Sequence, residues 1–146
     1  MTVMALDPGA KRIGVAVSDP RDSFAMPLEA IAVRGDGSHL KAIAAAAEER
    51  GVGLIVVGLP LNMDGSEGPA ARRARELAAA VRRASGKEVD LFDERLTTAQ
   101  AEREMIGRGM RREKRKERID SAAAALLLDA WLEVRRGMEE TTDGHR

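Results

Sequence analysis

Residues 2–18 read TVMALDPGAKRIGVAVS and consist of two apolar runs, 2–7 and 12–18, joined by the polar turn PGAK. This pattern predicts a β-hairpin, because both runs are apolar or alternate and the turn between them contains proline and glycine. The first run ends in Asp7, although its other residues indicate a buried strand. A charge at such a position is costly unless a cation or a hydrogen-bond donor meets it, so Asp7 is the first candidate for a functional residue.

The rest of the chain alternates between strand and helix patterns. Alternating or continuous apolar residues predict three further strands, over 28–34, 53–58 and 88–92. Helical spacing of apolar residues predicts four helices, over 38–50, 69–84, 97–107 and 112–136. Ser38 is the expected N-cap of the first helix, and Gly51 and Gly86 are expected to end the first and second helices. This order predicts an α/β fold in which a five-stranded mixed sheet has an antiparallel hairpin region followed by parallel strands.

The composition fits a single soluble domain of 146 residues, with 44% hydrophobic and 33% charged residues. We expect this domain to span 1–136 and a polar flexible tail to span 137–146. The absence of cysteine excludes disulfides and thiolate metal sites, and the two histidines cannot form an HExxH zinc site. No apolar stretch is long enough for a membrane span, and a charged residue follows the N-terminus too closely for a signal peptide. These features predict a cytoplasmic protein.

Three carboxylates lie at strand ends or beside apolar residues of a helix, where burial of a charged group would be costly. Asp7 ends the first strand, and Glu94 follows the fifth strand, with Asp93 as its alternative. Asp120 lies on the flank of the apolar stripe of the last helix. Each carboxylate alone could be a cap or turn residue, but parallel strands would bring the strand ends to one edge of the sheet. Three converging acids without histidine or cysteine form an all-oxygen site, which suits a pair of Mg²⁺ or Mn²⁺ ions.

Four ordered segments, within about residues 3–135, carry a family resemblance: ALDPGAKRIGVAVSD, VVGLPLNMDGSEGPAARRAREL, DERLTTAQAE and ERIDSAAAALLLDAWL. They resemble the signature segments of the YqgF/RuvX family of RNase H-like nucleases. The resemblance implies an RNase H-like fold with helices on both faces of the sheet. It also implies a metal-dependent nuclease that matures the 5′ end of pre-16S rRNA, with Asp7, Glu94 and Asp120 as catalytic metal ligands. An older family name, Holliday junction resolvase, implies branched DNA as an alternative substrate.

Basic residues near these acids are candidates for binding phosphate, although each could also be a solvated surface residue. Because the net charge is zero, attraction to nucleic acid must come from such local patches. In the hairpin turn, Lys11 and Arg12 lie beside Asp7, where the neighbouring Pro-Gly pair is expected to open the backbone to a phosphate. Arg95 follows the fifth strand and either holds phosphate or pairs with a carboxylate. The segment 111–118 has six basic and two acidic residues, among them the candidates Lys114, Arg115 and Lys116.

A polar loop follows the fourth strand and is expected to shape the edge of the site. Pro60 bends it, and Asn62 is expected either to contact substrate or to cap the turn, whereas Asp64 and Asp19 are interpreted as turn residues. The chain has two phenylalanines, one tryptophan and no tyrosine. Recognition through the backbone and shape of a nucleic acid is therefore favoured over base stacking.

Two other classes of function remain compatible with the sequence. A DxG hairpin also begins the nucleotide-binding core of the actin and sugar-kinase group, but that group closes a second domain over ATP. A non-catalytic RNA-binding assembly factor is the other alternative. The expected partners are structured RNA, branched DNA and the pre-ribosome, and the sequence leaves the oligomeric state open.

Overall fold

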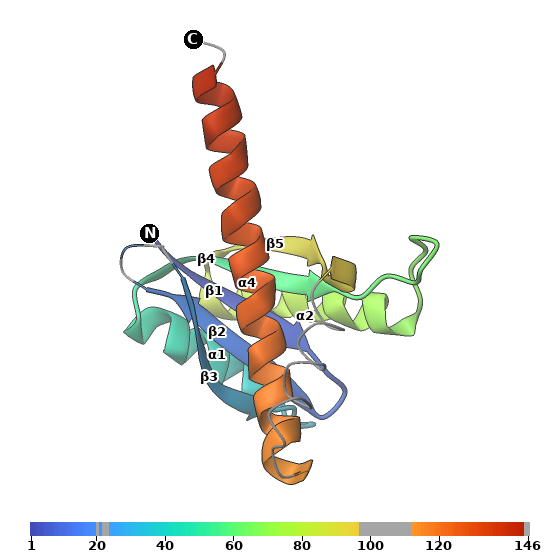
Figure 1. The fold of residues 1–146 in the computed structure, drawn as a ribbon. Coiled ribbons are helices and arrows are strands. Elements are labelled where there is room, and N and C mark those ends of the chain that lie inside the picture. The colour runs from blue at the N-terminus through green and yellow to red at the C-terminus, as the bar shows by residue number, and fades with distance from the viewer. Residues whose placement is uncertain (20, 22–23, 97–111, 145–146) are drawn as a thin grey trace.

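The computed structural model describes residues 1–19, 21, 24–96 and 112–144 (Figure 1), with side chains described except at 96, 112–120 and 138–144. Its elements, in chain order, are β1 (Thr2–Pro8), β2 (Arg12–Ser18), β3 (Ala25–Ala32), α1 (Ser38–Glu49), β4 (Val52–Leu59), α2 (Pro69–Ser85), β5 (Glu88–Asp93), the 3₁₀ turn η1 (Glu94–Leu96) and α4 (Arg112–Gly144). The helix expected over 97–107 lies outside the described residues.

The five strands form one mixed sheet in the order β3-β2-β1-β4-β5. The pairs β1–β2 and β2–β3 are antiparallel, whereas β1–β4 and β4–β5 are parallel. This confirms the α/β class and the antiparallel hairpin region followed by parallel strands. The third strand begins at Ala25 rather than at residue 28, because Pro27 is tolerated in a strand at the sheet edge, where its missing N–H breaks no ladder.

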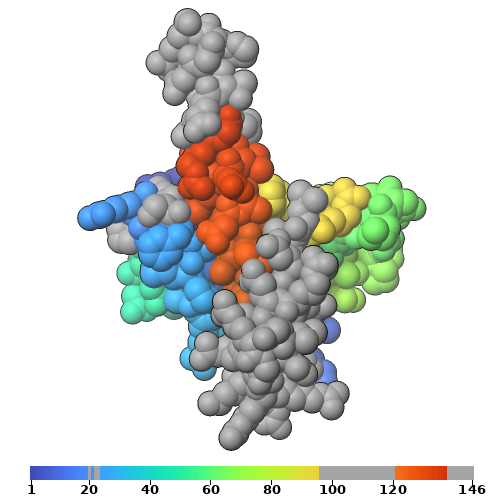
Figure 2. Space-filling model, viewed as in Figure 1, coloured from blue at the N-terminus to red at the C-terminus, as the bar shows by residue number. Residues whose placement is uncertain are grey.

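Helices cover both faces of the sheet, with α1 and α2 on one side and α4 across the other (Figure 1). Figure 2 shows α4 lying across the face that is turned to the viewer. Side chains of β1 alternate between the two cores. Met4 and Leu6 pack in the core under α1 and α2, while Val3 and Ala5 pack under α4. Asp7 follows this alternation and therefore belongs to the face that α4 covers. Among the described residues, no helix is both long and apolar enough to cross a bilayer.

Two hydrogen bonds fix the direction of α4 on the sheet. The buried Ser121 hydroxyl donates to the Leu28 carbonyl of β3, and two turns later the Asp129 carboxylate accepts the Ala25 N–H at 2.9 Å. Successive turns of α4 thus move towards the start of β3, which runs parallel to β1 because both pair antiparallel with β2. The N-terminal part of α4 consequently lies towards the carboxyl end of β1.

The ends of the helices depart from the sequence prediction in two places. The N-cap of α1 is Gly37, with φ +77°, and not Ser38, whose N–H is bound by the Asp36 carboxylate at 3.0 Å. This hydrogen bond lowers the pKa of Asp36. Helix α4 continues to Gly144, beyond the expected end at 136. Apolar spacing could not predict these last turns, because they project past the sheet and do not pack on it (Figure 1). The flexibility of 137–146 stays a prediction.

Candidate active site

The backbone of β1 places Asp7 near the carboxyl end of the central strand. Asp7 pairs with Gly14 of β2, and the preceding Leu6 pairs with Val57 of β4. Asp7 therefore lies level with Gly58, which follows Val57, on adjacent parallel strands that are about 4.8 Å apart. The Asp7 side chain is half-buried, at a level where the sheet ends and solvent begins.

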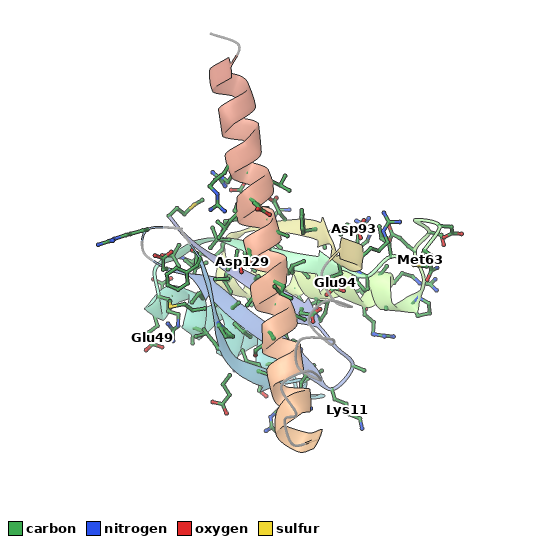
Figure 3. All side chains as sticks on the ribbon, in the orientation of Figure 1. Lys11, Glu49, Met63, Asp93, Glu94 and Asp129 are labelled. Carbon is green, nitrogen blue, oxygen red and sulfur yellow. The ribbon has the colours of Figure 1, made fainter. Side chains whose placement is uncertain are left out.

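Glu94 reaches the same edge from β5. It is the first residue of η1, directly after β5, and only 8% of it is exposed. Its side chain lies over Gly58: a Cβ at that glycine would stand 2.6 Å from Oε1 and 2.8 Å from Cδ of Glu94. Because Gly58 has no side chain, the Glu94 side chain can lie against the backbone of β4, the strand between β5 and β1. Figure 3 shows Glu94 at this end of the sheet.

Both carboxylates belong to the face that α4 covers. In β4, Leu54 and Val56 pack in the core under α4, and Gly58 follows them in the same alternation. Asp7 and Glu94 therefore share one edge and one face of the sheet. Sequence reasoning did not single out Gly58, although a glycine inside an otherwise β-branched central strand is a recognised sign of a close approach.

Asp93, the alternative to Glu94, is engaged elsewhere. Its Oδ2 atom accepts from Arg95 Nε at 2.9 Å and lies 2.7 Å from Nη2, and these interactions with Arg95 lower the pKa of Asp93. Arg95 also donates through Nη1 to the Met63 carbonyl at 3.4 Å. Of the two roles expected for Arg95, pairing with a carboxylate is therefore the one seen, and it connects the end of β5 to the loop after β4.

That loop is held by its own hydrogen bonds. The Asn62 N–H donates to the Ser66 carbonyl, and its side-chain amide donates to the Ser66 hydroxyl, both at 2.9 Å. Asp64 accepts from the Ser66 N–H and hydroxyl, which lowers the Asp64 pKa. Asn62 and Asp64 thus act as turn residues here, and Asp19 does so as well, accepting from Phe24 N–H at 3.1 Å. A substrate contact by Pro60 or Asn62 stays a prediction.

The β1–β2 turn holds two candidate cations. Lys11 is exposed in the turn, and Arg12 begins β2. The geometry of the turn excludes a side chain at Gly9, since a Cβ there would lie 2.5 Å from the Arg12 carbonyl oxygen. The tight turn itself therefore requires Gly9, and the approach of a phosphate to this backbone stays a prediction.

The position of Asp120 follows from the backbone of α4. It directly precedes Ser121, whose hydroxyl binds the Leu28 carbonyl. Through the strand pairing, Leu28 lies level with Val15 and Leu6, one residue before Asp7. The backbone at Asp120 thus lies towards the sheet edge that carries Asp7. Its side chain lies outside the described residues, as do those of the other α4 candidates, Lys114, Arg115 and Lys116.

A site built from these carboxylates offers only oxygen ligands. Within the described side chains, no group of three or more acids or histidines stands in metal-binding geometry. Of the three acids that the sequence predicts as metal ligands, the structure describes the side chains of Asp7 and Glu94 but not that of Asp120. An all-oxygen donor set is the chemistry that Mg²⁺ and Mn²⁺ prefer, so the residues present fit those ions.

A family profile described as "RuvX: Holliday junction resolvase" matches residues 1–134. The chain belongs to the RuvX family. A relative from Anaeromyxobacter sp. (strain Fw109-5) is 45% identical over 92% of this chain and 98% of its own length. Another, from Pelotomaculum thermopropionicum, is 45% identical over 91% of this chain and 87% of its own length. Both carry the description "Putative pre-16S rRNA nuclease".

Solved structures confirm the RNase H-like fold of this RuvX-family chain. The Thermus thermophilus RuvC complex with a Holliday junction substrate aligns with a TM-score of 0.56 over 94% of this chain and 96% of that chain, at 18% identity. The fowlpox virus Holliday junction resolvase aligns with a TM-score of 0.54 over 92% of this chain and 99% of that chain, at 11% identity. At these identities the likeness shows the fold alone, so the chemistry of the RuvX-family site rests on its own residues.

Proposed function

We propose that this RuvX-family protein is a metal-dependent endonuclease that hydrolyses phosphodiester bonds at the 5′ end of pre-16S rRNA. One observation carries the proposal: Glu94 lies across the bare backbone of Gly58, on the same edge and face of the sheet as Asp7. The description of relatives at 45% identity as pre-16S rRNA nucleases supports this choice of substrate. Because this proposed substrate is processed where ribosomes are assembled, we also propose a cytoplasmic location.

In the proposed site, Asp7, Glu94 and Asp120 hold two Mg²⁺ or Mn²⁺ ions. When bound, such ions activate water and stabilise the charge on the leaving oxygen. The protein contributes rigidity: Asp7 stands on a central strand, and Glu94 is almost fully buried against another. Carboxylates positioned by rigid elements keep their geometry without reorganising during the reaction.

Basic residues are proposed to hold the substrate through its phosphates. Lys11 and Arg12 flank the Asp7 turn, and Lys114, Arg115 and Lys116 lie in the first turns of α4. Phosphate contacts position a nucleic acid without reading its sequence, which agrees with a chain poor in aromatic residues. Arg95 contributes through its pair with Asp93, which holds the neighbouring loop in place.

The decisive experiment compares wild type with Asp7→Asn and Asp64→Asn on RNA that contains the 5′ leader of pre-16S rRNA. Asp7→Asn keeps the shape of the side chain and removes its charge, so cleavage in Mg²⁺ is expected to fall by orders of magnitude. Asp64→Asn alters a turn carboxylate of the exposed loop and serves as the control. Near-normal cleavage by a folded Asp7→Asn protein would refute the proposed role.

A four-way DNA junction is the second substrate in the same assay, because the family profile itself is described as a Holliday junction resolvase. Faster metal-dependent cleavage of the junction than of the RNA would favour that activity. RNA binding without cleavage in either metal would identify a non-catalytic assembly factor, and saturable ATP binding would favour the nucleotide-binding alternative.

A further inference from the structure

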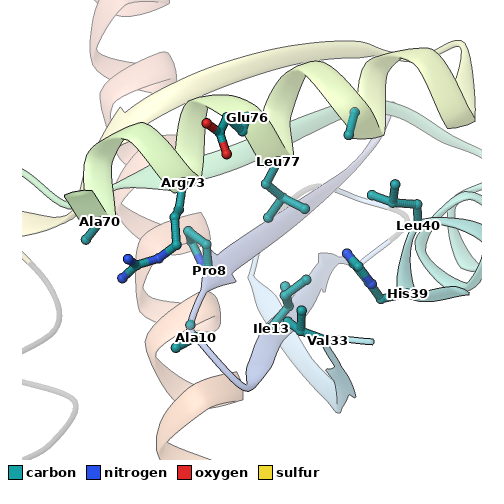
Figure 4. Close-up of a pocket in the computed structure, with 12 residues that line it drawn as sticks. Pro8, Ala10, Ile13, Val33, His39, Leu40, Ala70, Arg73, Glu76 and Leu77 are labelled. Atoms are coloured by element: carbon teal, nitrogen blue, oxygen red, sulfur yellow. The ribbon is translucent and has the colours of Figure 1, made fainter. Parts of the chain in front are cut away.

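A pocket of about 300 Å³ opens on the side of the sheet that faces away from α4 (Figure 4). The turn after β1 lines one wall, the start of α1 a second, and the first half of α2 a third. Three apolar side chains, Ile13, Leu40 and Leu77, contribute to its lining and also belong to or pack against the core under α1 and α2. Pockets of this size hold small ligands, so the volume suits one nucleoside-sized group.

The pocket is joined to the proposed active site by consecutive residues. Pro8, Gly9 and Ala10 line it, and Pro8 directly follows Asp7. Asp7 belongs to the α4 face, whereas the pocket opens on the opposite face, so the turn forms the rim between the two. A nucleic-acid strand whose phosphate lies at Asp7 therefore needs to cross only this short turn to place its neighbouring nucleotide in the pocket.

Polar groups on the lining match the parts of a nucleotide. The His39 Nδ1 atom accepts the Arg34 N–H at 3.2 Å, so in the neutral ring Nε2 carries the proton and is a donor. Glu76 offers an acceptor, and Arg73 offers a cation. Among the described residues, the side chains of Arg73 and Glu76 have no hydrogen-bond or ion-pair partner. A base edge carries donors and acceptors, and its phosphate is anionic, so one nucleotide can engage all three.

We propose that this pocket receives one unstacked nucleotide of the substrate, adjacent to the cleaved phosphodiester. The base lies on the apolar wall within reach of His39 and Glu76, and its phosphate pairs with Arg73. The proposal rests on the nuclease function stated above. A nucleotide held in the pocket would determine which phosphodiester bond lies at the active site and is cleaved. A nucleotide is favoured over a protein side chain because, in the proposed nuclease, a strand bound at Asp7 passes the rim at Pro8.

The first test compares Arg73→Ala with Arg72→Ala. Both arginines are exposed on α2, but only Arg73 lines the pocket. Removing one phosphate contact to a single strand lowers the slope of log affinity against log salt by about 0.7. Arg73→Ala is expected to show this lower slope and a raised KM with kcat retained, whereas Arg72→Ala stays near wild type. Equal effects of the two substitutions would overturn the assignment of Arg73.

The second test removes bases from the substrate one at a time. A single abasic position beside the cleavage site is expected to lower kcat/KM by roughly 5- to 50-fold, the range expected for losing one buried base. Val33→Trp, which fills the pocket from its exposed rim, is expected to lower wild-type cleavage and to abolish sensitivity to that abasic position. Val134→Trp makes the same substitution at a 50% exposed valine of α4, outside the pocket, and is the control.

The outcomes separate this inference from the nuclease proposal. If Asp7→Asn abolishes cleavage but no abasic position matters, the nuclease stands and the pocket does not bind a nucleotide. If Val33→Trp impairs cleavage only within a pre-ribosomal particle and not on free RNA, the pocket binds a protein of that particle, and the nucleotide assignment is wrong. If the wild type cleaves nothing, the nuclease proposal itself fails first.

Discussion

The side chain of Glu94 occupies the space that any side chain at Gly58 would need. A Cβ at Gly58 would meet Oε1, Cγ and Cδ of Glu94 at 2.6–2.8 Å, which no real Cβ tolerates. Gly58 belongs to β4 and Glu94 directly follows β5, so this contact couples the sequence of β4 to the position of the carboxylate after β5. Glycine at 58 is therefore a condition for the proposed metal site and not a local feature of its strand.

Gly58→Ala is expected to displace Glu94 and to weaken Mn²⁺ binding by about 10- to 100-fold, as loss of a positioning partner typically does. Electron paramagnetic resonance of free Mn²⁺ measures this without an activity assay. Gly53→Ala is the matched control in the same strand, because its Cβ would meet only the end of the exposed Met1 side chain. Unchanged Mn²⁺ affinity in a folded Gly58→Ala protein would show that Glu94 does not bind the ion.

Ser121→Ala is expected to lower the free energy of unfolding by about 1 kcal/mol, because the Leu28 carbonyl loses its buried donor. Urea unfolding followed by circular dichroism measures the change. This bond fixes where α4 lies along β3, and thereby the position of the neighbouring Asp120. Cleavage is therefore expected to fall by more than the loss of folded protein explains. Wild-type cleavage by a destabilised Ser121→Ala protein would instead limit the bond to a structural role.

Neutral replacement of Lys114, Arg115 and Lys116 by glutamine is expected to flatten the salt dependence of RNA binding. Each lost phosphate contact changes the log–log slope by about 0.7–0.9 and leaves base preference unchanged. Arg50→Gln, Arg82→Gln and Arg83→Gln together, at the ends of α1 and α2, remove the same three charges and provide a control for altered net charge. A slope that matches this control would identify the basic segment as a solvated surface.

Arg95→Met is expected to change how stability depends on pH. The Arg95 guanidinium holds the pKa of Asp93 below its usual range. A lowered folded-state pKa contributes stability that is present above the unfolded pKa of about 3.9 and is lost as pH falls through the folded value. The stability difference between wild type and Arg95→Met should thus be constant near neutral pH and shrink below about pH 4. Both side chains are partly exposed, so the difference is small and screened by salt. A difference that does not shrink at all as the pH falls below about 4 would place the role of Arg95 in packing.

Local patterns predict the order of strands and helices along the chain, because each element carries its own signal. The hairpin turn, the unbroken apolar run of β4 and the glycine after α1 with φ +64° are features of neighbouring residues. For the site, the sequence predicts only that residues at the carboxyl ends of parallel strands share one edge of the sheet. Asp7 and Glu94 lie at that edge. The contact between Glu94 and Gly58 depends on which strands are neighbours in space, which no local pattern encodes. The pairing of Arg95 with Asp93 is evident only in the structure, since Glu94 is even closer to Arg95 in sequence.

The attachment of α4 to β3 has a consequence for synthesis of the chain. Ser121 binds Leu28 across 93 positions, and Asp129 binds Ala25 across 104. Contacts between residues so far apart in sequence form slowly, because the intervening chain must first lose its freedom. During translation the first three strands emerge long before α4 exists, so one apolar face of their sheet remains bare until the final helix leaves the ribosome. We expect this nascent intermediate to bind chaperones, and truncation before residue 121 to yield an aggregating chain.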